Sequence, residues 1–198
     1  MNFELARHNM VAEQLARRGI RDARVLAAME RVPREKFVPP HLAFKAYDDC
    51  ALPIGWDQTI SQPYTVAYMC DEARLKPADT VLEIGTGSGY GAAVLAELAQ
   101  AVHTVERIEP LYREAAQRLA ELGYANVRVY LDDGSLGLAR ESPFDAILCT
   151  AGAESLPAAL QDQLADGGRL IIPIGPAGHQ EMFRLTRHGD RFTADRLG

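Results

Sequence analysis

The chain has 198 residues, of which 47% are apolar, so it can bury one sizeable core and is not a disordered chain. Its 27 acidic and 21 basic side chains give a net charge of −6 without any basic block, which argues against a nucleic-acid partner. There is no apolar run of about eighteen residues and no signal-peptide pattern, so the sequence predicts a cytoplasmic protein without a membrane span. The cysteines lack metal-ligand spacing and predict reduced packing residues: Cys50, Cys70 and Cys149.

The N-terminal part predicts short helices. Apolar residues spaced among charges predict a helix over 3–18, which Gly19 is placed to end. Asp22 can cap a second helix that runs to about Arg31, before several prolines stop helical continuation.

A third helix is predicted from about 63 to 74. Pro63 in its first turn puts Ser61 or Gln62 at the N-cap. From spacing alone, capping this helix is the favoured role of Ser61.

Strands and helices alternate from residue 76 onward. The predicted elements are a strand at 80–84, a helix at 90–99, a strand at 102–106, a helix at 109–122, strands at 127–131 and 145–150, a helix at 156–164 and a strand at 169–174. This alternation predicts a doubly wound α/β sheet. Two further segments, 181–186 and 191–196, predict a hairpin that adds an antiparallel edge. We expect one compact domain, with residues 1–75 packed on a core of residues 76–198.

The first of these strands runs into a glycine loop, Gly-Thr-Gly-Ser-Gly, at 85–89. Glycines let the backbone approach a ligand, and the helix that follows presents free N–H groups. Glu106 ends the next strand about 20 residues later, where doubly wound sheets hydrogen-bond a ribose. The pattern predicts a nucleotide site, and a tight turn without a ligand is the alternative.

The glycine spacing bears on which nucleotide is bound. Tyr90 stands at the third glycine of a dinucleotide motif, although the motif is satisfied one step later by Gly87, Gly89 and Ala92, so a dinucleotide remains an alternative. Glu83 would repel a pyrophosphate and attract an ammonium or sulfonium group. This favours S-adenosylmethionine.

Polar residues follow four of the predicted strands, and ligands of such sheets bind at the strand ends. Asp133 can offer a carboxylate to an adenine amino group, and Gly134 can bring its backbone close to the ring. The residues that we expect to converge there are 83–88, Glu106, 132–134 and Thr150.

Three segments together resemble the protein-L-isoaspartate O-methyltransferase family: Leu-Pro-Ile-Gly at 52–55, Gln-Thr-Ile-Ser-Gln-Pro at 58–63 and the glycine loop with its strand at 81–90. The loop is shared by many methyltransferases, whereas Thr-Ile-Ser-Gln-Pro is specific to this family. The resemblance extends back to 19–39 and forward through 105–107, 133–134, 143–145 and 167–170, which is nearly the whole chain.

This resemblance implies a Rossmann-like enzyme that moves a methyl group from S-adenosylmethionine to the free α-carboxylate of L-isoaspartyl residues in damaged proteins and peptides. The ester then collapses to a succinimide, and hydrolysis returns some aspartate. An acceptor carboxylate with a pKa of about 4 is ionised at neutral pH and needs no general base. The resemblance makes Ser61 the catalytic residue, as a hydrogen-bond donor to the carboxylate and not a covalent nucleophile.

The further site residues are expectations of the same kind. Cofactor binding is expected at Gln58, Thr59, Ile60, Glu83, Gly85, Thr86, Gly87, Ser88, Glu106, Asp133 and Gly134. Acceptor binding is expected at Ile54, Trp56, Thr59, Ser61 and Thr150, with no metal.

Several positions depart from the family pattern, and two of them concern the expected acceptor site. Asp57 stands where a small residue is common, and Trp56 beside it is bulky, so the acceptor mouth is expected to be more crowded by side chains and more negative. This motivates a second hypothesis, a methyltransferase for another carboxylate or a small molecule, and a non-catalytic cofactor binder is a third. A short chain with one core is expected to be a monomer.

Overall fold

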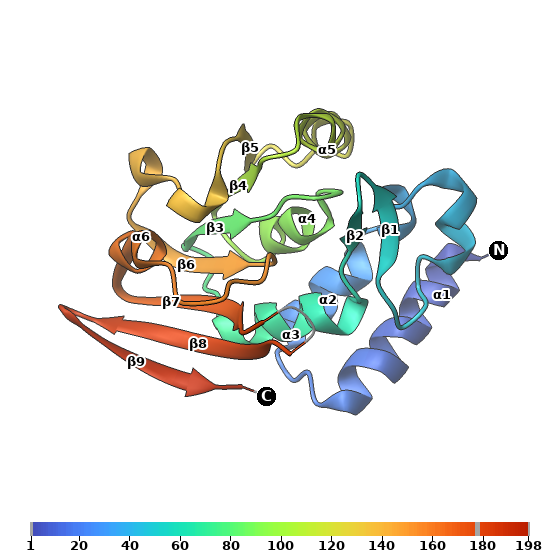
Figure 1. Cartoon of the computed structure of the whole chain (residues 1–198). Coiled ribbons are helices and arrows are strands. Elements are labelled where there is room, and N and C mark those ends of the chain that lie inside the picture. The colour runs from blue at the N-terminus through green and yellow to red at the C-terminus, as the bar shows by residue number, and fades with distance from the viewer. Residues whose placement is uncertain (1, 177–178, 198) are drawn as a thin grey trace.

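The computed structural model of the chain describes residues 2–176 and 179–197 (Figure 1). Its helices are α1 (Phe3–Asn9), α2 (Ala23–Arg31), α3 (Pro63–Ala73), α4 (Tyr90–Ala96), α5 (Glu109–Glu121) and α6 (Ala158–Asp162). Its strands are β1 (Leu52–Gly55), β2 (Gln58–Ile60), β3 (Thr80–Ile84), β4 (Ala101–Glu106), β5 (Val127–Leu131), β6 (Phe144–Cys149), β7 (Leu164–Ile174), β8 (Glu181–His188) and β9 (Arg191–Arg196). No helix in the described ranges has the length and apolar composition that crossing a bilayer requires.

Seven strands form one sheet in the order β5-β4-β3-β6-β7-β8-β9, and β1 and β2 form a separate antiparallel hairpin. Strands β3 to β7 are parallel, whereas β8 and β9 run antiparallel at one edge. The doubly wound sheet, the N-terminal helices and the antiparallel edge are therefore confirmed.

Most predicted boundaries agree with the structure to within a few residues, and three elements differ. Strand β7 begins at Leu164 instead of 169, because Phe144 pairs with Leu164 before the register shifts. Helix α6 is shorter than the predicted 156–164. The β1–β2 hairpin was not predicted, because its two strands have only four and three residues.

The first helical segment changes pitch along its length. Helix α1 continues as a π-helix over Met10–Leu15 and as a 3-10 turn over Ala16–Arg18, and Gly19 ends it at φ 100°. The predicted cap of α2 is confirmed, since the Asp22 side chain accepts a hydrogen bond from the Arg24 N–H.

Alternation along each strand divides the core into two layers. Val81 of β3 and Val102 of β4 belong to the larger layer, which contains buried residues of α2, α3 and α4. Leu82 and Ile84 point to the opposite layer, which is closed by α6. Glu83 has the same parity as Val81, so its carboxyl faces the layer that contains α2, α3 and α4 instead of the layer closed by α6.

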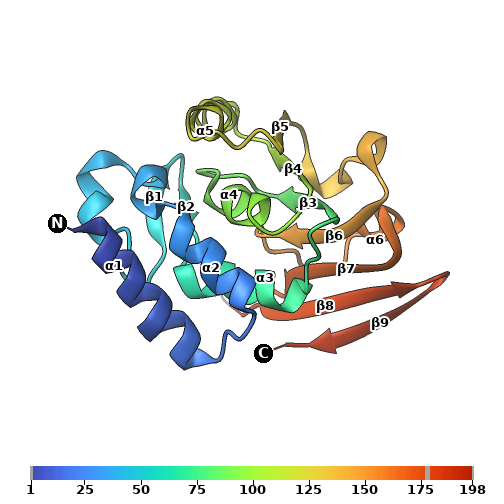
Figure 2. The ribbon, with the colours of Figure 1, turned by 180° about the vertical axis from the view of Figure 1, so that it is seen from behind.

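The N-terminal helices and the end of the chain lie on the same side of the molecule, as the view from behind shows (Figure 2). The hydroxyl of Tyr68 in α3 donates a hydrogen bond to the Leu197 carbonyl over 2.7 Å. This contact ties the last described residue to the helical segment.

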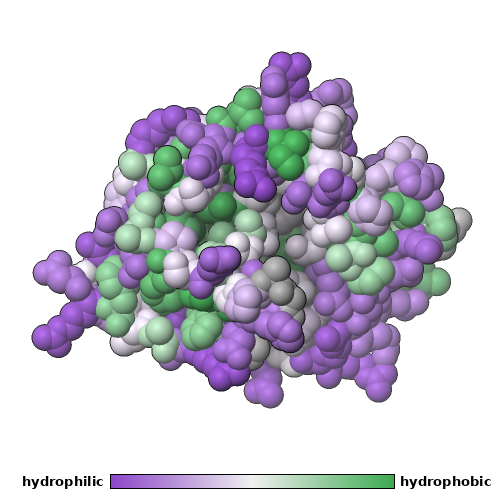
Figure 3. Space-filling model, in the orientation of Figure 1, coloured by the Kyte–Doolittle hydropathy of each residue, from purple (hydrophilic) through white to green (hydrophobic). Residues whose placement is uncertain are grey.

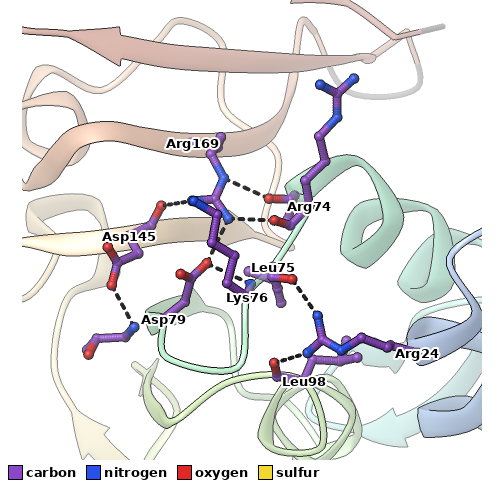
Figure 4. Close-up of polar contacts among 10 residues, drawn as sticks. Arg24, Arg74, Leu75, Lys76, Asp79, Leu98, Asp145 and Arg169 are labelled. Carbon is purple, nitrogen blue, oxygen red and sulfur yellow. Dashed lines mark hydrogen bonds and ion pairs between the residues drawn. The ribbon is translucent and has the colours of Figure 1, made fainter.

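An arginine-centred network joins the starts of the central strands (Figure 4). Arg169 of β7 donates to the carbonyls of Ala73 and Asp145 over 2.8 Å each and pairs with the nearly buried Asp79 at 2.8 Å. Arg24 of α2 reaches the carbonyl of Leu75 nearby. Guanidinium groups suit this position because their planar donors can reach several acceptors at once.

Candidate active site

The residues predicted to bind ligands lie at the carboxyl ends of β3, β4, β5 and β6, opposite the arginine network. A pocket of about 290 Å³ opens there, and the face drawn in Figure 3 is hollowed left of its centre, where apolar groups lie among hydrophilic ones. Of the predicted residues, Gln58, Gly85, Glu106, Asp133 and Gly134 line this large pocket.

A smaller cavity of about 40 Å³ adjoins the large pocket, since Gly85 lines both. It brings together the segment after β2, the glycine loop and the end of β6. The predicted residues that line this small cavity are Thr59, Ile60, Ser61, Glu83, Gly85, Thr86, Gly87, Ser88 and Thr150.

The β1–β2 hairpin lies next to the glycine loop. Ile54 lines neither cavity, but its Cδ1 atom lies 3.4 Å from the place that a Cβ on Gly87 would occupy. Trp56 at the hairpin tip is 58% exposed and also lines neither cavity. Its φ of 55° is uncommon for a bulky residue.

Ser61 does not cap α3. The N-cap is Gln62, which makes no side-chain cap hydrogen bond, so the capping role that spacing favoured for Ser61 is wrong. The Ser61 carbonyl accepts a hydrogen bond from Arg34 Nη2 at 2.7 Å, while the half-buried side chain lines the small cavity. Its hydroxyl has no hydrogen-bond partner among the described residues and is available to a ligand.

The glycine loop is held from the neighbouring strand. The N–H groups of Gly85 and Thr86 both donate to the Val105 carbonyl, at 2.9 and 3.2 Å. Gly85 adopts φ 97°, and a Cβ there would lie 2.5 Å from Thr150 Oγ1. Thr150 is fixed in turn, because its hydroxyl donates to the carbonyls of Ile84 and Gly85 over 3.0 Å each.

Glu106 accepts three backbone hydrogen bonds and is almost buried. Its Oε2 accepts from the Gly87 N–H at 2.8 Å, and its Oε1 accepts from the N–H groups of Arg107 and Ile108 at 2.9 and 3.0 Å. The carboxylate therefore organises the glycine loop in addition to lining the large pocket.

Replacing Glu106 by alanine is expected to weaken cofactor binding by about 1 to 3 kcal/mol, because a charge-assisted hydrogen bond is lost and the loop N–H groups lose their acceptor. Titration calorimetry with S-adenosylhomocysteine measures this. Glu109→Ala, at an exposed carboxylate paired with Arg113, is the control and should leave affinity unchanged. Unchanged affinity in Glu106→Ala would remove Glu106 from the cofactor site.

Glu83 is buried between β3 and α4. Its Oε2 accepts a hydrogen bond from Thr104 Oγ1 at 2.6 Å, and a Cβ on Gly91 would lie 2.1 Å from its Oε1. Burial, together with the nearby Glu106, raises the pKa of Glu83 to about 8 against the opposing hydrogen bond from Thr104. The carboxyl is thus mostly protonated at neutral pH, unlike the ionised group that the sequence suggested.

We expect Glu83→Gln to change how stability depends on pH. The folded protein holds the Glu83 proton more tightly than the unfolded chain, so the associated stability is full below the ordinary pKa of 4.5 and is lost as pH rises through about 8. Glutamine stays neutral, so the variant should match the wild type at acid pH and exceed it by about 1 to 3 kcal/mol at alkaline pH. Urea unfolding at both pH values checks this. The same difference at both values would contradict the protonated assignment.

The loop after β5 supplies the other wall of the large pocket. Asp133 is exposed, and hydrogen bonding from Ser135 lowers the pKa of its carboxyl. Gly134 packs on β3, since a Cβ there would lie 2.5 Å from Ile84 Cγ2. A side chain at 134 would therefore push into the floor of the pocket.

Several residues that line the large pocket were not predicted. They are Val105, Arg107, Ile108, Ser135, Cys149, Ala151, Gly152, Ala153, Pro157 and Leu160. Cys149 was expected only to pack. The available signal was position, because most of these residues follow directly after a strand that ends at the pocket.

The shape and lining of the two cavities suit an adenosine carrying a charged tail. Gly85 and Gly134 line the large pocket with their backbone, and a Cβ at either position would collide with a neighbouring side chain. The Glu106 carboxylate also borders the large pocket, and Glu83 and Ser61 border the small cavity. Together with the parallel sheet, these features define a nucleotide-binding α/β protein of the methyltransferase class.

Comparisons with known proteins agree with this class. The model of the protein-L-isoaspartate(D-aspartate) O-methyltransferase family matches residues 6–197. A protein-L-isoaspartate O-methyltransferase of Synechococcus sp. (strain JA-2-3B'a(2-13)) is 57% identical over 87% of this chain and 71% of its own length. One of Geobacter metallireducens is 51% identical over 96% of this chain and 88% of its own length. The chain belongs to the protein-L-isoaspartate(D-aspartate) O-methyltransferase family.

Solved structures are similar as well. A protein-L-isoaspartate O-methyltransferase superposes with a TM-score of 0.86 at 29% identity, covering 96% of this chain and 62% of that chain. A putative protein-L-isoaspartate O-methyltransferase from Plasmodium falciparum, in complex with S-adenosyl-L-homocysteine, has a TM-score of 0.82 at 28% identity and covers 96% of this chain and 94% of that chain.

Proposed function

We propose that the chain transfers a methyl group from S-adenosylmethionine to the free α-carboxylate of L-isoaspartyl residues in damaged proteins and peptides. The ester would cyclise to a succinimide with loss of methanol, and hydrolysis of that ring would return some aspartate. The observation that carries the proposal is that the Ser61 side chain and the glycine loop line one small cavity, in a chain that belongs to this family. The P. falciparum relative in complex with S-adenosyl-L-homocysteine supports the choice of cofactor.

Bound S-adenosylmethionine would supply an electrophilic methyl group. The residues of the chain then have to hold the acceptor in line and keep water out, because the acceptor carboxylate is already ionised at neutral pH. Ser61 would donate its hydroxyl hydrogen to the carboxylate, and the neighbouring Thr59 and Ile60 line the same cavity. Apolar walls such as Ile60 and Val66 would limit water there.

We assign cofactor binding to residues of both cavities: Gln58, Thr59, Ile60, Glu83, Gly85, Thr86, Gly87, Ser88, Glu106, Asp133 and Gly134. Acceptor binding is assigned to Ile54, Trp56, Thr59, Ser61 and Thr150. All of these except Ile54 and Trp56 line a cavity, and Trp56 is assigned as an exposed contact at the mouth. In this division residues 1–75 carry the acceptor loop together with Gln58, Thr59 and Ile60 of the cofactor site, and residues 76–198 form the cofactor core.

The test is radiolabelled methyl transfer to a synthetic isoaspartyl peptide, run beside its aspartyl twin and a control without peptide. Selective labelling of the isoaspartyl peptide is the expected result. If S-adenosylhomocysteine binds but neither peptide is labelled, the repair function is wrong and another acceptor must be sought. That the protein is a monomer and that it is cytoplasmic both stay predictions. Light scattering in solution tests the oligomeric state.

A further inference from the structure

Arg34 is a fully buried arginine directly behind the small cavity. It lies in a 3-10 turn at Arg34–Phe37, and its side chain is 0% exposed. Nε donates to the Ala46 carbonyl at 2.7 Å, and Nη2 donates to the Ser61 carbonyl at 2.7 Å. The guanidinium carbon also lies 4.7 Å from the ring centroid of Tyr90. Ser61 and Tyr90 both line the small cavity, so Arg34 supports two of its walls.

The charge of Arg34 is not balanced within the described part of the chain. No carboxylate in the described ranges forms an ion pair with it, and its buried Nη1 has no hydrogen-bond partner. The neighbouring Glu35 instead accepts a hydrogen bond from the Tyr47 hydroxyl. Burial lowers the pKa of Arg34 from its ordinary value, but a guanidinium stays protonated in proteins. A buried cation without a partner is costly, which calls for a physical reason.

The opposite wall of the cavity does not supply the missing negative charge. Glu83 is the carboxyl group that lines it, and burial raises the pKa of Glu83 to about 8, so the group is mostly neutral at pH 7. Tyr90 also lines the cavity, and Cys70 lies close to Glu83. Burial raises the pKa of both groups above their ordinary values, so both are neutral as well. Arg34 does not line the cavity itself, so its charge acts from behind Ser61 and Tyr90 on a cavity whose lining carboxyl group is neutral.

We propose that Arg34 is a positioning residue for the methyl acceptor, fixing the main chain of Ser61 and supplying the buried positive charge that balances the acceptor carboxylate. The inference rests on the proposed function and specifies how that site selects an anion. The aromatic face of Tyr90 and the two carbonyls hold the guanidinium in place. The charge therefore does not have to move when the acceptor carboxylate binds.

The test compares two ligands of nearly the same shape, of which only one carries the acceptor charge. One is an isoaspartyl peptide, and the other is the same peptide with its isoaspartyl α-carboxylate replaced by a carboxamide. Their affinities are measured by titration calorimetry with S-adenosylhomocysteine present, which prevents turnover. The wild type should prefer the carboxylate.

Two variants separate charge from hydrogen bonding. Arg34→Gln keeps a neutral donor, and we expect the preference for the carboxylate to fall about tenfold. Arg34→Lys keeps the charge with fewer directed donors, and its preference should stay within about threefold of the wild type. The affinity for S-adenosylhomocysteine, which reports an intact site, should be retained in both variants. Arg24→Gln is the matched control, because Arg24 also donates to two backbone carbonyls, of Leu75 and Leu98, far from the cavity (Figure 4).

The outcomes are distinct. If both peptides weaken equally in Arg34→Gln, or if Arg34→Lys loses the preference, Arg34 does not balance the acceptor charge. Loss of S-adenosylhomocysteine affinity together with peptide affinity in both variants would show a role in folding only and would overturn the proposal. If the wild type binds the cofactor product but neither peptide, the proposed function itself fails.

Discussion

Replacing Ser61 by alanine is expected to lower kcat for an isoaspartyl peptide about 10- to 100-fold, while the affinity for S-adenosylhomocysteine stays within about threefold. The hydroxyl lines the small cavity and has no hydrogen-bond partner among the described residues, so removing it disturbs nothing that the fold requires. The Ser61 carbonyl, which Arg34 holds, is unchanged by the substitution. Steady-state kinetics and titration calorimetry on the same preparation give both quantities.

Ser142→Ala is the control for this substitution. The Ser142 hydroxyl donates to the Ala139 carbonyl in a turn away from both cavities, and kcat should be unaffected. Equal losses of turnover and cofactor affinity in Ser61→Ala would show that Ser61 builds the cofactor site instead of acting on the acceptor.

Gly85→Ala is expected to weaken S-adenosylhomocysteine binding at least about 100-fold, the largest binding effect that we predict. Two penalties act together: a non-glycine residue at φ 97° is strained by about 1 to 2 kcal/mol. In addition, the new Cβ would lie 2.5 Å from Thr150 Oγ1 and displace a side chain that is tied to the loop by two hydrogen bonds. Titration calorimetry measures the loss.

Gly123→Ala separates strain from collision. Gly123 follows α5 at φ 83°, and a Cβ there would meet nothing within 4 Å. This variant should lose about 1 kcal/mol of stability and keep its cofactor affinity. If Gly85→Ala binds as well as Gly123→Ala, the contact with Thr150 has no part in shaping the site.

The sheet could be predicted because local and long-range preferences agree there. Strands β3 and β5 begin and end where predicted. Strand β3 is buried along most of its length and mainly apolar, as a central parallel strand requires, whereas β5 is a partly exposed edge strand. The hairpin of β1 and β2 was missed in the sequence because Trp56 and Asp57 form its turn at positive φ, where Asn-Gly is the usual signal. Its strands were too short to show alternation.

The site was predictable in position but not in protonation. Strand ends placed Glu106, Asp133 and the glycine loop at one edge of the sheet, as the structure confirms. The state of Glu83 could not be read from the chain, because it depends on the helix packed over it and on its contact with Thr104. Arg34 was likewise invisible, since nothing in a sequence shows which arginine is buried.

The arginine network has a consequence for how this protein tolerates change. Arg169, Asp79 and Arg24 join the starts of the strands, whereas both cavities lie at the strand ends. The contacts that stabilise the sheet and the residues that meet ligands thus lie at opposite ends of its strands. Engineering for heat resistance near Asp79 should escape the usual trade-off between stability and activity, because reinforcement there leaves the loops that meet the ligands free to adjust.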